Sequence, residues 1–202
     1  MNAGLILAAG ESRRMGSPKA LLEYRGETFL DTLCGLFAAR CTPVIVVLGA
    51  AAEEIRARAA RPATFVVNHG YQSGQTSSMQ CGLRAVPPDS EGVLFTLVDH
   101  PAVTPGTIDA LLDNTGRNAC ATGGNACATL LRVPRCQGRR GHPIWISPTL
   151  IPEFLALPKD GAARDVVRSH ADETEFIDVN DPGILADIDD PEAYRSLIGA
   201  GL

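Results

Sequence analysis

Near its start the chain reads Leu5-Ile6-Leu7-Ala8-Ala9-Gly10-Glu11-Ser12-Arg13-Arg14-Met15-Gly16-Ser17-Pro18-Lys19. The apolar part has the length of a β-strand and stops at Ala-Ala-Gly, and the loop that follows holds a second glycine, hydroxyl groups, two arginines and a lysine. Residues without bulk let a backbone approach a polyphosphate, and the cations neutralise its charge. The stretch therefore predicts a strand followed by a phosphate-binding loop. The alternative from composition alone is a strand, a tight turn and a solvated basic loop.

Two well-known phosphate-binding motifs do not fit this loop. A P-loop requires Gly-x-x-x-x-Gly-Lys-Ser/Thr, whereas here five residues separate Gly10 from Gly16, and Lys19 follows three positions later. The dinucleotide fingerprint Gly-x-Gly-x-x-Gly fails because Ser12 occupies its second glycine position. An NAD-dependent oxidoreductase is therefore disfavoured.

The pattern that does fit runs from Leu7 to Lys19 as Leu-Ala-Ala-Gly-x-Ser-x-Arg-Met-Gly-x-x-Lys. It resembles the signature of the nucleotidyltransferases that activate a phosphate or sugar phosphate with a nucleoside triphosphate. Within that group the chain resembles the molybdenum cofactor nucleotidyltransferases, and in particular their cytidylyltransferase branch. The resemblance implies that Arg14 and Lys19 are catalytic and hold the β- and γ-phosphates. It also implies a nucleotide site that includes Leu7, Ala8, Ala9, Gly10 and Ser12.

Length and composition indicate one globular domain over residues 1–202, since 45% of the 202 residues are hydrophobic and 20% are charged. The net charge of -5 gives no sign of a nucleic-acid partner. No apolar run reaches the ~20 residues of a membrane span, and a signal peptide is not expected. The cysteines lack Cys-x-x-Cys spacing, so we expect reduced thiols in a cytoplasmic protein and no structural zinc. They are Cys34, Cys41, Cys81, Cys120, Cys127 and Cys136.

Strands and helices are predicted to alternate in the first half, and the second half is less regular. This order predicts an α/β fold with three layers, in which an open, mostly parallel sheet of the Rossmann-like nucleotidyltransferase type has a small antiparallel excursion in the second half. Thr28 and Thr104 are expected to cap helices. After the first strand, the expected strands are 43–49, 64–68, 92–98, 120–122, 129–133, 144–147 and 176–179. The expected helices are 28–40, 51–60, 77–86, one that opens at 104–105, 149–157, 162–170 and 191–198.

Asp99 directly follows the apolar run of residues 92–98. Ligands of open α/β sheets lie outside the carboxyl ends of the strands, so the loop of residues 10–19, Asn68 and Asp99 should face one crevice. A carboxylate beside a triphosphate suits Mg²⁺, which favours one or two carboxylates together with phosphate oxygens. In the resembled family an Asp-x-Pro at this position is the metal site, which implies the same role for Asp99. His100, the middle residue, is given no catalytic role.

A polar segment from Asn68 to Met79 resembles the family pattern of Asn, then Gly, then Ser-Ser-Leu. It leads into a helix whose first turn offers hydroxyls and free backbone N–H groups to a ribose, base or phosphate. We therefore assign Asn68, Gly74, Ser77 and Ser78 to the nucleotide site. The alternative for Ser77 is a plain helix cap.

A basic segment, Gly138-Arg139-Arg140-Gly141-His142-Pro143, resembles the Gly-x-x-Gly-His-Pro motif of the cytidylyltransferase branch. An anionic second substrate requires such a cationic patch. We assign Arg139, Arg140, Gly141 and His142 to the acceptor site, with a solvated loop as the alternative.

Near its end the chain reads Leu185-Ala186-Asp187-Ile188-Asp189-Asp190-Pro191-Glu192, which is similar to the closing Asp-Ile-Asp-Thr-Pro-Glu-Asp segment of the family. Asp190 is a suitable N-cap ahead of Pro191. The segment also offers a second metal ligand, for which we choose Asp187 over Asp189.

The resemblance implies an Mg²⁺-dependent reaction in which CTP and molybdenum-loaded molybdopterin give molybdopterin cytosine dinucleotide and pyrophosphate, with a molybdenum hydroxylase as a client. CTP is preferred over GTP because the guanylyl branch more often reads Leu-x-Gly-Gly where this chain has Leu7-Ala8-Ala9-Gly10. The alternatives are molybdopterin guanylyltransferase, the isoprenoid-pathway methylerythritol phosphate cytidylyltransferase, sugar-phosphate nucleotidyltransferases and the lactate-type phosphate guanylyltransferase. A non-catalytic assembly factor that holds the cofactor for a hydroxylase is a further alternative.

Overall fold

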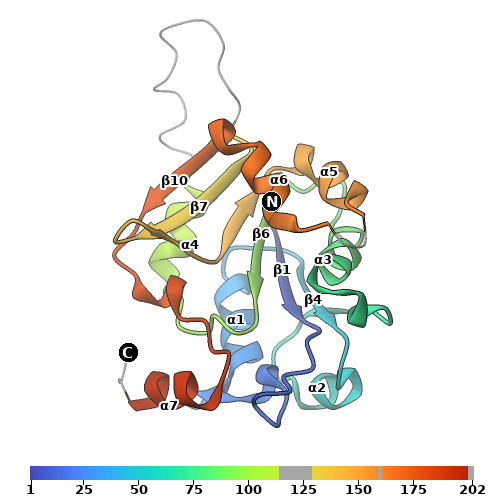
Figure 1. Cartoon of the computed structure of the whole chain (residues 1–202), viewed down its shortest axis with the longest axis vertical. Coiled ribbons are helices and arrows are strands. Elements are labelled where there is room, and N and C mark those ends of the chain that lie inside the picture. The colour runs from blue at the N-terminus through green and yellow to red at the C-terminus, as the bar shows by residue number, and fades with distance from the viewer. Residues whose placement is uncertain (114–128, 159–160, 200–202) are drawn as a thin grey trace, which may run out of the picture.

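The computed structural model describes residues 1–113, 129–158 and 161–199. One large sheet runs through the middle of the molecule with helices on both sides of it (Figure 1). Its strands are β1 (Ala3–Ala8), β4 (Val44–Leu48), β5 (Thr64–Val67), β6 (Val93–Leu97), β7 (Leu131–Cys136), β8 (Arg139–Arg140), β9 (Ile144–Ile146) and β10 (Thr174–Asp178). A separate two-stranded hairpin is made by β2 (Glu23–Tyr24) and β3 (Glu27–Thr28). The helices are α1 (Phe29–Ala38), α2 (Ala52–Arg58), α3 (Gln75–Leu83), α4 (Pro105–Leu112), α5 (Ile151–Ala156), α6 (Ala163–Ser169) and α7 (Pro191–Gly199).

The order of strands in the sheet is β10-β7-β9-β6-β1-β4-β5, with β8 paired to β7. β1 lies between β4 and β6 and is parallel to both, and β5 extends this parallel part. β9 runs antiparallel to β6 and to β7, while β10 is parallel to β7. The mostly parallel sheet with an antiparallel excursion in the second half is therefore confirmed.

Alternate residues of β1 enter the two hydrophobic cores that lie on opposite faces of the sheet. Ile6 packs with residues of α1, α2, α4 and α7, and Leu5 packs with residues of α3, α5 and α6. Side chains of a strand point alternately to the two faces, and a strand covered on both sides is apolar throughout. Every residue of β1 is accordingly buried. The prediction of a three-layer fold is confirmed.

Most predicted elements are found, with shifted ends. α3 begins at Gln75 and not at Ser77, because Gly74 is its N-cap. Thr28 caps α1 as predicted, since its hydroxyl accepts a hydrogen bond of 3.0 Å from the N–H of Asp31. Thr104 precedes α4 as predicted, but its hydroxyl makes no cap and instead donates to Asp181.

Three further points concern the sequence predictions. The strand predicted for residues 120–122 lies outside the described residues. The hairpin of β2 and β3, and strand β8, were not predicted, because two-residue strands carry no periodic pattern. The described cysteines Cys34, Cys41, Cys81 and Cys136 are free thiols. Asp190 caps α7, because its carboxylate accepts a hydrogen bond of 2.9 Å from the N–H of Ala193. No helix within the described ranges is long and apolar enough to cross a membrane.

His170, which follows α6, pairs with two glutamates. Its Nε2 lies 2.8 Å from a carboxylate oxygen of Glu153, and its Nδ1 contacts the carboxylate of Glu173. These two hydrogen bonds raise the pKa of His170. A group whose pKa is higher in the folded than in the unfolded state stabilises the folded protein. For a histidine this stabilisation is complete below the unfolded pKa of about 6.5, and it is lost as the pH rises through the folded pKa.

We therefore expect the wild-type protein to lose stability relative to His170→Gln as the pH rises from about 6 through the raised folded pKa. Urea unfolding of both proteins at a series of pH values measures the difference. The comparison with the variant removes the contributions of the other titrating groups. A difference that stays constant with pH would contradict the prediction.

Candidate functional site

The loop between β1 and Lys19 is held by its own serine. Ser12 has a φ of 51°, and its hydroxyl accepts a hydrogen bond of 3.0 Å from the backbone N–H of Lys19. Gly16, with a φ of 69°, supplies the left-handed turn between them, a conformation that favours glycine. The loop therefore folds back on itself and brings Lys19 to the carboxyl end of β1.

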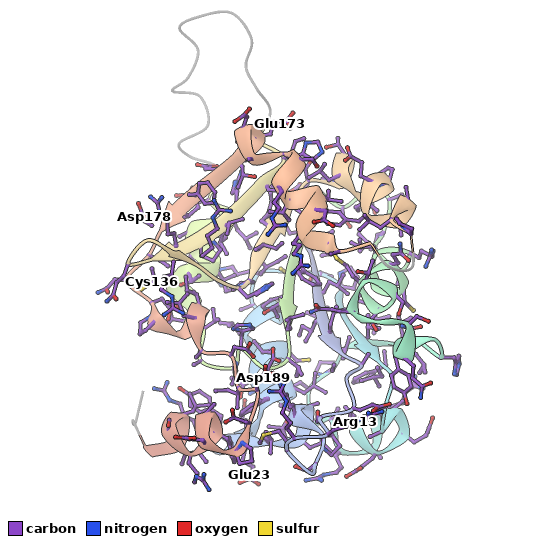
Figure 2. All side chains as sticks on the ribbon, viewed as in Figure 1. Arg13, Glu23, Cys136, Glu173, Asp178 and Asp189 are labelled. Carbon is purple, nitrogen blue, oxygen red and sulfur yellow. The ribbon has the colours of Figure 1, made fainter. Side chains whose placement is uncertain are left out.

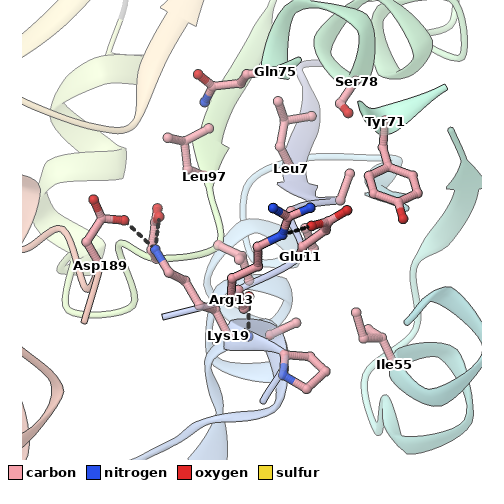
Figure 3. Close-up of a pocket in the computed structure, with 18 of the residues that line it drawn as sticks. Leu7, Glu11, Arg13, Lys19, Ile55, Tyr71, Gln75, Ser78, Leu97 and Asp189 are labelled. Atoms are coloured by element: carbon pink, nitrogen blue, oxygen red, sulfur yellow. Dashed lines mark hydrogen bonds and ion pairs between the residues drawn. The ribbon is translucent and has the colours of Figure 1, made fainter. Parts of the chain in front are cut away.

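A cavity of about 450 Å³ lies at the carboxyl ends of β1 and β6 (Figure 3). The predicted nucleotide residues that line it are Leu7, Ala8, Ala9, Gly10, Ser12, Arg14, Lys19, Gly74 and Ser78. The lining also includes Glu11, Arg13, Pro18, Ala20, Ile55, Tyr71, Gln75, Leu97, Val98, Asp99 and Asp189. A Cβ added to Gly10 would meet nothing within 4 Å, so the backbone at this position faces open space. We call this space the first cavity.

Asn68 and Ser77, two of the predicted nucleotide residues, do not line the first cavity. The side-chain amide of Asn68 is buried and donates hydrogen bonds of 3.0 Å to the hydroxyls of both Ser77 and Ser78. Ser77 in turn donates to the backbone oxygen of Gly74. Asn68 thereby fixes the first turn of α3, and of the two serines only Ser78 reaches the cavity.

Lys19 is the central cation of the first cavity, and it is paired on two sides. Its Nζ lies 2.9 Å from Oδ2 of Asp99 and 2.6 Å from Oδ1 of Asp189, and Figure 3 shows the lysine paired with Asp189. Burial lowers the pKa of Lys19, but the hydrogen bonds to Asp189 and Asp99 outweigh burial, and the net shift is upward. Arg14 approaches Asp189 at 3.4 Å from the solvent side. A charged Lys19 thus stands at the base of the cavity, where an anionic ligand would compete with the carboxylates for it.

Asp99, His100 and Asp187 form a cluster beside Lys19. Each of the three offers a ligand atom, and these atoms lie within 4.8 Å of one another. Oδ1 of Asp99 is buried and has no hydrogen-bond partner among the described residues. Burial, and next the charges of Asp99 and Asp189, raise the pKa of Asp187. An oxygen without a partner and a second carboxylate nearby fit a divalent cation, which takes oxygen ligands and would relieve the repulsion. The choice of Asp187 over Asp189 as second metal ligand stays a prediction.

The segment that carries Asp187 and Asp189 is held in place by Asp181, which the sequence analysis did not select. This carboxylate is 3% exposed and accepts hydrogen bonds from the N–H and hydroxyl of Thr104, the hydroxyl of Thr107 and the N–H of Gly183. Further along, the N–H of Ile188 donates to the backbone oxygen of Asp99 at 3.1 Å. The Asp-Pro-Gly sequence at 181–183 marks a turn, but nothing in it indicates the partners on α4.

A second cavity of about 420 Å³ borders the first, and the two share Gln75 and Leu97 in their linings. Of the predicted acceptor residues, Arg140, Gly141 and His142 line it and Arg139 does not. Its walls are mostly apolar, and Arg164 adds a second cation. The remaining lining residues are Thr76, Met79, Phe95, Val133, Ile144, Phe154, Ala162, Ala163 and Val167.

His142 lines the second cavity and packs against His100, the neighbour of Asp99 in the sequence. Its ring centroid is 5.0 Å from that of His100 and 5.8 Å from that of Phe95. Burial, together with His100, lowers the pKa of His142 to about 4, so the ring is neutral at pH 7. Its backbone is fixed by a bond from its N–H to the oxygen of Ile184.

Several residues of the first cavity were missed by the sequence analysis. Tyr71 and Gln75 belong to the quoted segment from Asn68 to Met79 but were not selected, although an aromatic ring in a polar loop is a useful sign of stacking on a base. Arg13 and Glu11 pair with each other at the rim of the cavity. Asp189 was considered only as a metal ligand, whereas here it pairs with Lys19.

Comparison with known proteins gives matches over nearly the whole chain. Residues 4–174 match the family described as MobA-like NTP transferase domain. The nicotine blue oxidoreductase of Paenarthrobacter nicotinovorans is 35% identical, with 96% of this chain and 95% of that protein covered. The molybdenum cofactor cytidylyltransferase of Escherichia coli is 24% identical over 94% of this chain and 92% of its own length. The crystal structure of Rv0371c from Mycobacterium tuberculosis is 30% identical and superposes with a TM-score of 0.82 over 98% of this chain and 97% of that chain. Its complex with manganese, also solved, gives 26% identity and a TM-score of 0.76 over 98% of both chains.

Proposed function

The chain belongs to the MobA-like NTP transferase family and is a nucleotidyltransferase, and from this premise we propose that it is a cytoplasmic enzyme that transfers the cytidylyl group of CTP to molybdenum-loaded molybdopterin. The observation that carries the proposal is the pair of adjoining cavities. The first has Lys19 and Asp99 at the carboxyl end of the sheet, and the second has Arg140 and His142. Two substrates with anionic groups would meet where the cavities share Gln75 and Leu97.

In the proposed reaction an oxygen of the acceptor phosphate attacks the α-phosphorus of the nucleotide. The new P–O bond forms while the bond from the α-phosphorus to the bridging oxygen breaks, and that oxygen leaves with pyrophosphate. A phosphate monoester has its second pKa near ~6, so at neutral pH it is largely dianionic and needs no general base. Catalysis then consists mainly of positioning and charge neutralisation. Lys19 and Arg14 would leave their contacts with Asp189, and they would then hold the β- and γ-phosphates of the nucleotide.

We propose Mg²⁺ as the cation of the reaction, with Asp99 and Asp187 as the residues that would hold it. A bound divalent cation neutralises phosphate charge and orients the triphosphate. The proximity of Asp99 and Asp187 and the unpartnered Oδ1 of Asp99 support this assignment. The manganese complex of Rv0371c supports a divalent cation in this family.

The choice of CTP rests on the Leu7-Ala8-Ala9-Gly10 segment, which lines the first cavity. The Cβ of Ala9 would reduce the room for a purine, and Tyr71 across the cavity offers a ring on which a base could stack. Guanylyl transfer stays the alternative within the family. A molybdenum hydroxylase as client of the product stays a prediction.

Arg140 should affect the acceptor more than the nucleotide. We expect Arg140→Ala to raise the KM for the acceptor about ten-fold or more, because Arg140 lines the second cavity and not the first. The KM for the nucleotide should change little. Steady-state kinetics with each substrate varied in turn measures both constants.

Arg139→Ala is the matched control for this prediction, because Arg139 is the neighbouring arginine on β8 and does not line the second cavity. Equal effects of the two substitutions would mean that the cationic segment acts only through its overall charge.

One observation favours a second candidate function. The relative named nicotine blue oxidoreductase is 35% identical over 96% of this chain, and the second cavity has the apolar walls that suit an aromatic substrate. A redox activity would change the oxidation state of such a substrate in the presence of an electron donor or acceptor, and it would release no pyrophosphate.

The decisive experiment measures pyrophosphate release with Mg²⁺ and each of CTP, GTP, UTP and ATP, with and without molybdenum-loaded molybdopterin. Release that needs both CTP and the pterin supports the proposal. Release with GTP, with methylerythritol phosphate or with a sugar phosphate would move the chain to another branch of the nucleotidyltransferases. Tight pterin binding without release would favour the assembly factor. Consumption of NADH with an aromatic acceptor, and no release with any nucleotide, would favour the second candidate.

A further inference from the structure

We propose that His100 is a metal ligand together with Asp99 and Asp187, and that this mixed nitrogen and oxygen site binds Mn²⁺ and other divalent transition metals more tightly than Mg²⁺. This inference deepens the metal site of the proposed function, but it does not depend on which nucleotide or acceptor the enzyme uses. Nothing in the sequence pattern assigned a role to His100.

The first argument is distance. Nε2 of His100 lies 3.9 Å from Oδ1 of Asp99. A transition metal lies about 2.0–2.2 Å from each ligand atom, so two ligands of one ion are separated by at most about 4.4 Å. The two atoms are therefore close enough to bind the same ion without moving. One carboxylate oxygen of Asp187 lies within 4.8 Å of a ligand atom of each of the other two residues, which leaves a small side-chain adjustment to complete the set.

The second argument is that polar atoms in this cluster lack partners. His100 is 6% exposed, and its Nδ1 is buried with no hydrogen-bond partner among the described residues. Oδ1 of Asp99, which faces the imidazole, is also buried without a partner there. Buried polar atoms are nearly always hydrogen-bonded, and the exceptions need an explanation such as a bound ion or water. An ion bound at this point would explain the atom of Asp99 directly.

The two oxygens of Asp99 have different surroundings. Oδ2 accepts a hydrogen bond of 2.9 Å from Nζ of Lys19, on the side of the first cavity. Oδ1 is turned to His100. A metal at Oδ1 would therefore leave the contact with Lys19 intact, and the two cations would lie on opposite sides of one carboxylate.

The cluster lies close to both cavities. Asp99 lines the first cavity and His142 lines the second, and the ring of His100 packs 5.0 Å from that of His142. An ion held at His100 would thus be near both substrates.

The identity of the ion follows from the ligand types. Carboxylates alone suit Mg²⁺, which dehydrates reluctantly and prefers oxygen, whereas an imidazole nitrogen favours transition metals. Removal of the nitrogen should therefore lower the affinity for Mn²⁺ much more than that for Mg²⁺. Mg²⁺ can still occupy the site when it is present in large excess.

The experiment measures Mn²⁺ binding to the nucleotide-free, full-length protein by electron paramagnetic resonance, with electron spin echo modulation to detect a coordinated histidine nitrogen. Competition with Mg²⁺ gives the ratio of the two affinities. We expect bound Mn²⁺ to show a nitrogen coupling in the wild-type protein. His100→Asn should remove the coupling and weaken Mn²⁺ binding by about ten-fold or more, with a much smaller change for Mg²⁺.

His69→Asn is the matched control, because His69 is exposed and does not line either cavity. Asp187→Asn is the second variant, and it should weaken Mn²⁺ binding while the nitrogen coupling stays. Circular dichroism checks that each variant folds. If His100→Asn does not fold, the nitrogen coupling measured in the wild-type protein and in Asp187→Asn still tests the proposal. Absence of Mn²⁺ binding in the wild-type protein, oxygen-only coordination, or a coupling that persists in His100→Asn would overturn the proposal. None of these outcomes would affect pyrophosphate release with CTP and the pterin.

Discussion

Asp99→Ala should lower nucleotide-dependent pyrophosphate release by about 10³-fold or more while the fold stays intact. Asp99 contacts Lys19 on one side and clusters with His100 and Asp187 on the other, so its loss removes a proposed metal ligand and one partner of Lys19. Charge stabilisation of this kind contributes several kcal/mol to a transition state, and single contributions are typically worth 10²–10³-fold in rate. The measurement is the rate of pyrophosphate release at saturating substrate, with circular dichroism as the check on folding.

Asp109→Ala is the matched control, because it removes an aspartate that pairs with Arg40 at the surface of α4 and lines neither cavity. Its rate should equal that of the wild-type protein. Asp189→Asn offers a second comparison, since Asp189 pairs with Lys19 but lies outside the cluster with His100. If Asp99→Ala kept full activity with Mg²⁺, Asp99 would have no part in the metal site.

The parallel half of the fold could be predicted because its strands are buried on both faces. β1, β4 and β6 are continuous apolar runs separated by helical segments, and this pattern indicates parallel strands with helices on each side. The rule that ligands bind at the carboxyl ends of the strands then predicts that the loop of residues 10–19 and Asp99 lie together. The first cavity lies at these strand ends.

The second half of the site could not be predicted to the same detail, because it depends on antiparallel pairing between distant segments. β9 returns beside β6, and this brings His142 next to His100, forty-two positions earlier in the chain. The difference between Arg139 and Arg140 has a local cause, since successive residues of a strand point to opposite faces. A prediction from the composition of the basic segment alone assigns the same role to both arginines.

Asp181→Ala should be the most destabilising single substitution we propose, with a loss of about 3–5 kcal/mol in the free energy of unfolding. The carboxylate is 3% exposed, and its removal leaves the buried donors of Thr107 and Gly183, and the more exposed donors of Thr104, without this acceptor. Each buried donor that loses its partner costs about 1–3 kcal/mol, although such costs do not add fully. For a chain of this size the loss corresponds to roughly 6–20 °C in Tm, which thermal unfolding measures directly.

The surface carboxylate of Asp178 supplies the control, because it lies at the sheet edge formed by β10 and pairs with Arg135 in solvent (Figure 2). Asp178→Ala should leave Tm nearly unchanged, since exposed ion pairs contribute little. The Tm of Asp181→Asn should lie between those of Asp181→Ala and Asp178→Ala, because an amide keeps one acceptor oxygen for the donors around position 181. Asp181 precedes the segment that presents Asp187 to Asp99, so its variants should also weaken Mn²⁺ binding at temperatures where they remain folded. A large fall in Tm with unchanged Mn²⁺ affinity would show that the segment keeps its position at Asp99 through its own contacts, such as the bond from the N–H of Ile188.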